Sequence, residues 1–132
     1  MTIEQAITIN SSPEKVYNAL MSATEFAEVT GAPADIAADE GGAFSCFGGQ
    51  VVGRNIELVP NQRIVQAWRV GPWPEGVYSI VRFDLSASGD ATTIDFVHTG
   101  YPQDAKEDLE SGWHKMYWQP LKAYLEQDAV TK

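Results

Sequence analysis

The strongest hydrophobic pattern in the chain covers residues 104–127. Large apolar residues recur there at steps of three and four, which is the spacing of one face of an α-helix. These residues are Leu109, Trp113, Met116, Tyr117, Leu121, Tyr124 and Leu125. Because a helix with so aromatic a face needs a second apolar surface, the rest of the chain must supply one of similar length. Pro120 lies inside the stretch and predicts a kink, since its ring clashes with the carbonyl group of Met116.

Ahead of this helix, apolar and polar residues alternate in a series of short segments, which indicates β-strands. Ile3, Ile7 and Ile9 mark the first strand. Gly48 and Gly49 separate two later segments and predict a two-residue hairpin turn. The later strands are expected around Ile36 and at residues 43–47, 50–59, 63–70, 77–85 and 92–98.

Two short helices are predicted between the first strand and the rest of the sheet. Ser11 is the expected cap of the first, with Pro13 in the first turn and Glu14 three residues after the cap. The second helix is expected at residues 25–29, with Thr24 as its cap.

The links between the later strands have hairpin length, which favours an antiparallel meander. A sheet of this kind twists and curves, so the long helix can lie across its concave face. We therefore predict an α+β fold in which residues 1–132 form one domain. A curved antiparallel sheet of about six to seven strands wraps on the long C-terminal helix, and two short helices follow the first strand. An apolar pocket between sheet and helix is expected in such an arrangement.

Composition excludes several classes of partner. The formal charge is −9, from 18 acidic and 9 basic residues, which argues against nucleic acid and against anionic membranes. The single cysteine, Cys46, excludes a disulfide bond within the chain and fits a reducing compartment. The first ten residues lack the pattern of a signal peptide, and no apolar stretch has the length of a membrane span. We expect a cytoplasmic protein.

No motif in the chain carries recognisable catalytic chemistry. His98 and His114 are expected to be packed or surface residues, and Cys46, with no cationic neighbour in sequence, a small core residue. Two histidines and one cysteine at unrelated spacings predict no metal site. The glycine pairs do not form a phosphate-binding loop, and no cofactor motif is present. We therefore expect no catalytic residues, no metal and no cofactor.

Trp73 is the unusual aromatic residue of the sequence, because it stands between two prolines in the loop 71–76. One interpretation is that Trp73 caps one end of the sheet. The other is that it contacts a partner protein, since tryptophan is enriched at interface hot spots.

Short segments spread over residues 7–125 carry a resemblance to a known family, through their order and spacing. They are residues 11–17, 32–34, 38–44, 53, 58–60, 64–65, 68–69, 73–76, 92–93, 98–100 with Pro102, 112–113 and 117–118. The sequence resembles the activators of the heat-shock protein 90 ATPase, within the START-like (SRPBCC) superfamily. The loop 73–76 and the segment 32–34 are most similar to the C-terminal domain of the eukaryotic co-chaperone. The resemblance implies the helix-grip fold, a stress-related co-chaperone role and no catalytic triad.

Two functional hypotheses follow from these observations. The first is a non-catalytic binding protein that contacts a heat-shock protein 90 class chaperone, with Trp73 and Glu75 as candidate contact residues. The second is a carrier or sensor of a small apolar ligand held between sheet and helix, although a filled core is also compatible with the pattern. The candidate lining residues for this ligand are Trp68, Phe83, Phe96, Trp113, Met116 and Tyr117. A cyclase- or hydrolase-like enzyme is a third interpretation, which needs inward polar groups, first of all Arg82 or His98.

Overall fold

The computed structural model describes the backbone of residues 2–130 and the side chains of residues 2–126. The strands are β1 (Thr2–Ile9), β2 (Ala34–Ile36), β3 (Ala43–Cys46), β4 (Val51–Val59), β5 (Arg63–Val70), β6 (Ser79–Ser88) and β7 (Ala91–Thr99). The helices are α1 (Pro13–Met21), α2 (Ala23–Thr30), α3 (Lys106–Gly112) and α4 (Gln119–Val130). Short 3₁₀ turns form η1 (Phe47–Gly49) and η2 (Gln103–Ala105), and a π turn, Trp113–Trp118, joins α3 to α4.

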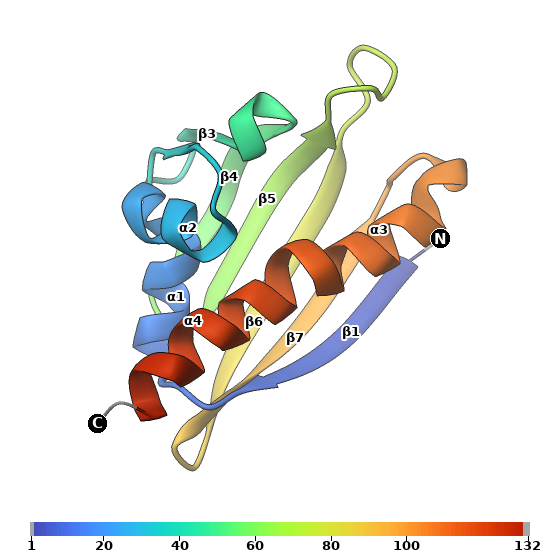
Figure 1. Ribbon diagram of the computed structural model, residues 1–132. Helices are drawn as coiled ribbons and strands as arrows, with labels where there is room; N and C mark the ends of the chain where they lie inside the picture. Colours follow the sequence, from blue (N-terminus) through green and yellow to red (C-terminus); the bar gives the residue numbers. More distant parts are fainter. Residues whose placement is uncertain (1, 131–132) are drawn as a thin grey trace.

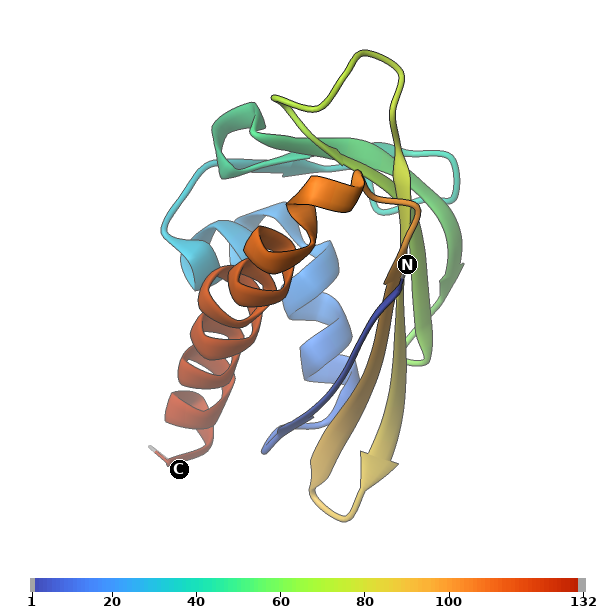
Figure 2. The ribbon, with the colours of Figure 1, turned by 90° about the vertical axis from the view of Figure 1, so that its right-hand side faces the viewer.

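The strands form one antiparallel sheet of seven, in the order β1-β7-β6-β5-β4-β3-β2. Strand β1 therefore returns to the far edge and pairs with β7, while β2–β7 follow one another as a meander. The continuous helix from α3 to α4 crosses the sheet diagonally, with α1 and α2 beside its C-terminal half (Figure 1). Seen from the side, the sheet curves around these helices (Figure 2). The predicted α+β helix-grip arrangement is confirmed.

Serines cap both short helices. The cap lies one residue after the predicted position in α1 and two residues before it in α2. Ser12, not Ser11, caps α1, and its hydroxyl group accepts a hydrogen bond from the Lys15 amide. Because Pro13 is the first helical residue, the cap must be the residue directly before it. Ser22, not Thr24, caps α2, since that helix already begins at Ala23.

The long helix is irregular just before Pro120. The amide of Gln119 donates to the carbonyl group of His114, five residues back, instead of four. Proline has no N–H with which to continue the normal ladder, and π turns accommodate such interruptions. The wider turn shifts the helical register, so Met116, which we expected on the buried face, is 47% exposed.

The connection between β3 and β4 is longer than the predicted two-residue turn. The strands end at Cys46 and resume at Val51, and η1 fills the interval. Phe47 and Gly48 both have positive φ there, +55° and +67°, which turns the chain sharply. Phe47 consequently projects toward the helix, and its ring packs 5.7 Å from the ring of Tyr117.

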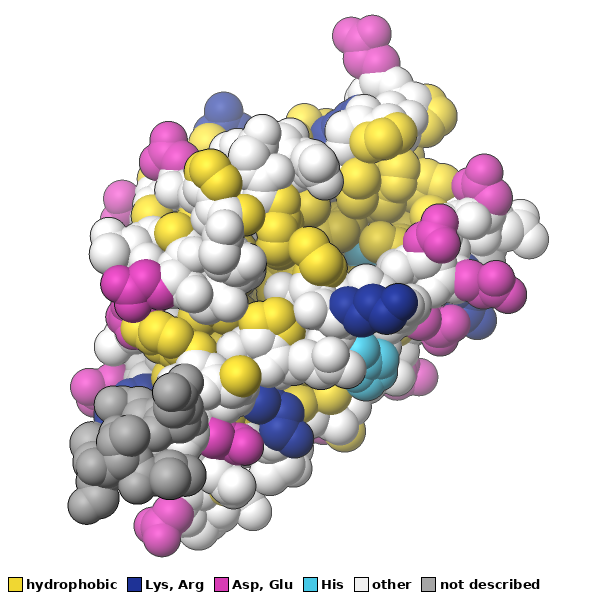
Figure 3. Space-filling model, viewed as in Figure 1, with side chains coloured by type: hydrophobic (Ala, Val, Ile, Leu, Met, Phe, Trp, Pro, Cys, Tyr) yellow, Lys and Arg dark blue, Asp and Glu magenta, His cyan; other side chains and the backbone are white. Residues whose placement is uncertain are grey.

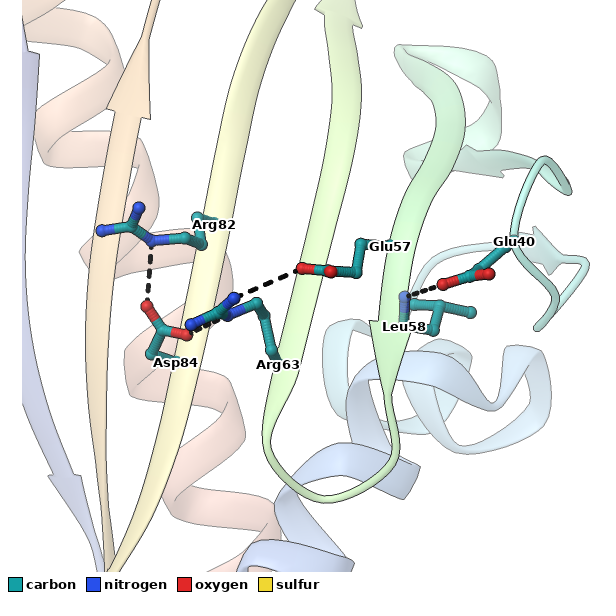
Figure 4. A network of polar contacts seen from close by, with 6 residues as sticks. All are labelled: Glu40, Glu57, Leu58, Arg63, Arg82 and Asp84. Carbon is teal, nitrogen blue, oxygen red and sulfur yellow. Dashed lines mark hydrogen bonds and ion pairs between the residues drawn. The ribbon is translucent and has the colours of Figure 1, made fainter.

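Ionic contacts cross the outer, convex face of the sheet (Figure 4). The Asp84 carboxylate accepts from Arg63 at 2.7 Å and pairs with Arg82 at 2.9 Å, while Arg63 also pairs with Glu57. The Glu40 carboxylate accepts from the Leu58 amide. Arg82 therefore lies outside the sheet, and the suggestion that it points into a pocket is wrong.

The described helices do not include one with the length and hydropathy of a membrane span.

Candidate functional site

Aromatic rings fill the space between the concave face of the sheet and the long helix. Trp113, in the π turn, is the hub of this cluster and is 2% exposed. Its ring lies 4.3 Å from Phe96, 4.3 Å from Tyr117 and 5.2 Å from Trp68. Because the rings come from β5, β7 and the π turn, the cluster ties the helix to the middle of the sheet.

A cavity of about 130 Å³ lies at one end of this cluster, where α3 faces η1 and β5. We call it the α3 pocket. It is lined by Phe47, Gln50, Val51, Trp68, Asp108, Leu109, Gly112, Trp113, Met116 and Tyr117. Figure 3 shows apolar side chains exposed in a hollow between the β5–β6 loop and the start of the long helix, with acidic side chains on its rim. The pocket is therefore mainly apolar and reachable from outside.

The structure brings together four of the proposed ligand-lining residues. Trp68, Trp113, Met116 and Tyr117 line the α3 pocket. Phe83 and Phe96 do not line it; they are 2% and 1% exposed and pack beneath the Trp113 ring.

Sequence reasoning missed the lining residues of the hairpin and of α3. The alternation pattern predicts that one strand ends at Phe47 and the next begins at Gln50, with a two-residue turn between them. It does not indicate that η1 folds over the pocket. In the sequence, Asp108 is typical of the first turn of a helix, and Gly112 is a residue that weakens a helix. The signal that could have found them is the position of Gly112, four residues after Asp108 and three after Leu109, since residues three and four apart are neighbours on a helix surface.

A buried chain of hydrogen bonds runs behind the pocket and fixes the state of His98. The Trp113 indole N–H donates to His98 Nδ1 at 3.0 Å, and the Ser79 hydroxyl donates to the carbonyl group of Trp68 at 3.0 Å. His98 Nε2 lies 2.7 Å from the same hydroxyl oxygen. Since Ser79 has already given its one proton, Nε2 must be the donor and Nδ1 the acceptor. The imidazole is thus neutral, and both of its nitrogen atoms are engaged.

This arrangement predicts a specific pH dependence of stability. Burial lowers the pKa of His98 from 6.5 to about 4. Because the unfolded chain binds the proton first, the contribution of His98 is complete above pH 6.5 and is lost as the pH falls toward 4. Between pH 6.5 and 5 the free energy of unfolding should drop by about 1.5 kcal/mol on account of this residue.

Urea unfolding of two histidine variants checks the assignment. His98→Gln should lose this part of the pH dependence, whereas His114→Gln, at an exposed position, should keep it. Equal slopes in the two variants would show that His98 is not the titrating group.

The remaining nucleophile of the core is also held in its neutral form. Burial raises the pKa of the Cys46 thiol to about 12. Burial also raises the pKa of the Tyr117 phenol, with a smaller contribution from nearby Cys46. Within the described part of the chain, no group of three His, Cys, Asp or Glu side chains is placed to hold a metal ion.

The β5–β6 loop, residues 71–78, is held rigidly by one side chain. The Arg69 guanidinium donates to the carbonyl groups of Gly71, Trp73, Pro74 and Val77. Trp73 is half-buried, with its ring 5.8 Å from that of Trp68. Glu75 is exposed. Trp73 therefore packs on the end of the aromatic cluster and also presents part of its ring to solvent.

The fold and this site define the helix-grip, or START-like, class: a curved antiparallel sheet closed on a C-terminal helix, with an apolar pocket at one end. Within that class, the model of the family described as Activator of Hsp90 ATPase homolog 1-like protein matches residues 10–126. The chain belongs to this family.

A curated relative agrees with this assignment. The chain is 31% identical over 115 residues to the human Activator of 90 kDa heat shock protein ATPase homolog 1, covering 87% of this chain and 34% of the relative. It therefore spans about a third of the length of the curated relatives it matches.

Two solved structures share the fold over most of the chain. An Hsp90 activator from Plasmodium falciparum superposes with a TM-score of 0.90, at 24% identity, over 96% of both chains. CalU16 from Micromonospora echinospora superposes with a TM-score of 0.80, at 18% identity, over 98% of this chain and 79% of that one. At these identities the likeness shows the fold alone.

Proposed function

We propose that this chain is a non-catalytic binding domain that contacts an Hsp90-class chaperone and modulates its ATPase. Membership of the Hsp90-activator family is the observation that carries the proposal. The absence of catalysis in this proposal is supported by two side chains of the core. His98 and Cys46 are the residues best suited to acid–base or nucleophilic chemistry, and both are buried and neutral. The contact surface we propose is the β5–β6 loop with the adjoining α3 pocket.

Trp73 and Glu75 are the proposed contact residues of the loop. Trp73 offers part of a large ring on a backbone that Arg69 holds in place, so little conformational entropy is lost on binding. Glu75 places a negative charge beside it on an otherwise short, apolar loop. Tryptophan is among the residues most enriched at interface hot spots.

The test is the ATPase rate of the cognate Hsp90-class chaperone, titrated with the purified domain. We expect a saturable change in rate. Trp73→Ala and Glu75→Lys should each raise the half-saturating concentration. For Trp73→Ala the increase should be roughly 30-fold, since a hot spot is worth about 2 kcal/mol. The charge-reversal control is Asp90→Lys, in the β6–β7 turn at the opposite end of the sheet, which should leave the half-saturating concentration unchanged.

An unchanged ATPase rate at saturating domain, together with no binding in the same mixture, would overturn the proposal. Binding without a change in the ATPase rate would support the proposed contact and contradict the proposed effect on the ATPase.

A second candidate function is the carrying of a small apolar ligand, which the α3 pocket favours. Its volume of about 130 Å³ limits the ligand to the size of one aromatic ring, because pockets for larger ligands hold about 300–1,000 Å³. Native mass spectrometry of the purified protein decides this. A bound mass of that size would support a carrier, and a bare chain with no thermal shift from benzene or indole would reject it.

A further inference from the structure

The α3 pocket has a glycine in its wall that the backbone does not require. Gly112 has helical torsion angles, φ −63° and ψ −39°, which any residue adopts. A Cβ atom built there would meet nothing within 4 Å. Glycine is the least favourable helix residue after proline, so an alanine would stabilise the helix without a clash. The missing side chain instead leaves open space on the pocket side of the helix.

One charged group of the pocket lining is without a partner among the described side chains. Asp108 is the one charged residue of the lining, and it is exposed without an ion pair or hydrogen bond to any residue whose side chain the structure describes. A carboxylate at an apolar rim attracts a cation.

We propose that the α3 pocket receives one large apolar side chain of a partner protein, from a segment that also carries a lysine or arginine beside it. This rests on the proposed function and names the chemistry of the contact. The volume decides the occupant: about 130 Å³ is close to cavities of about 150 Å³ that hold benzene, the size of a phenylalanine ring. The cation pairs with Asp108.

Short peptides test the recognition directly. The isotope-labelled domain is titrated with acetyl-Lys-Lys-Phe-Lys-Lys-amide while backbone amide shifts are recorded. Shifts are expected at Phe47, Gln50, Asp108 and Gly112, with a Kd on the order of 1 mM, as for one buried ring. The peptide with alanine in place of phenylalanine should bind at least about tenfold more weakly, as should the peptide with four glutamates.

A pocket-filling variant supplies the second arm. Gly112→Leu should abolish peptide binding while the melting temperature stays at or above that of the unchanged domain. The control is Ser111→Leu, one position away on the exposed side of α3, which should bind normally. Asp108→Asn should keep phenylalanine binding but lose the preference for lysine over glutamate neighbours.

The outcomes separate this inference from the proposed function. If Gly112→Leu binds peptide as well as Ser111→Leu does, or if the shifts lie elsewhere, the inference is wrong. If the peptide binds in the pocket but the chaperone does not bind the domain, the inference stands and the proposed function fails. If phenethylammonium binds as tightly as the peptide, the pocket is a small-amine site and the partner segment is rejected.

Discussion

Replacing Trp113 by alanine is expected to lower the free energy of unfolding by about 5 kcal/mol. Removing a buried tryptophan ring costs about 3–5 kcal/mol through lost transfer energy and the cavity left behind. The same change leaves His98 Nδ1 buried without its donor, which adds about 1–3 kcal/mol. Since domains of this size are stable by about 5–15 kcal/mol, the variant should lose between about a third and all of its stability.

Urea unfolding, followed by circular dichroism, measures this loss. Trp113→Phe separates the two parts, because it keeps most of the ring volume but not the N–H, and should lose about 2 kcal/mol. His114→Ala, at the exposed neighbouring position, should change stability by less than about 0.5 kcal/mol. A Trp113→Ala protein as stable as His114→Ala would mean that the aromatic cluster does not hold the helix on the sheet.

The second large effect is expected at Gly53, which lies opposite Trp68 in the β4–β5 pair. A Cβ atom there would overlap the carbonyl oxygen of Ala67 and come within 2.7 Å of Cζ of Phe44. Because the first obstacle is backbone, no rotamer change relieves it, and strands β4 and β5 would have to separate. Gly53→Ala should therefore cost about 3 kcal/mol, the upper end of the usual range for overpacking.

The matched control adds the same methyl group where there is room. Gly112→Ala should raise stability by about 0.5–1 kcal/mol, as helix propensity dictates. Thermal unfolding of the two variants should thus move in opposite directions. A Gly53→Ala protein with an unchanged melting temperature would show that the two strands are not so closely apposed.

The sequence predicted the fold well because its strongest periodicities are long and regular. The apolar spacing from Leu109 to Leu125 and the alternation in β5–β7 are set by burial on one face, and burial is what the pattern records. The alternation pattern does not predict which strand β1 pairs with, since the same alternation would suit any edge of the sheet. The pairing of Ile3 with His98 and of Ile7 with Ile94 places it.

The candidate site was harder to predict because local backbone geometry decides it. The π turn shifts the helical register by one residue, and this places Met116 at the surface, where it lines the pocket. Hydrophobic spacing alone does not indicate such a turn. The positive φ of Phe47 swings η1 over the pocket, although non-glycine residues rarely adopt that conformation. Phe83 and Phe96 belong to strands that face the helix, but Trp113 is large enough to cover them.

The most direct test of the account follows the backbone amides of the labelled domain while unlabelled Hsp90-class chaperone is added. Binding through the proposed surface predicts shifts or broadening concentrated at the α3 pocket and the β5–β6 loop, with Ile80 and Arg82 on the convex face unchanged. An unaltered spectrum at saturating chaperone, or changes confined to the convex face, would contradict the account.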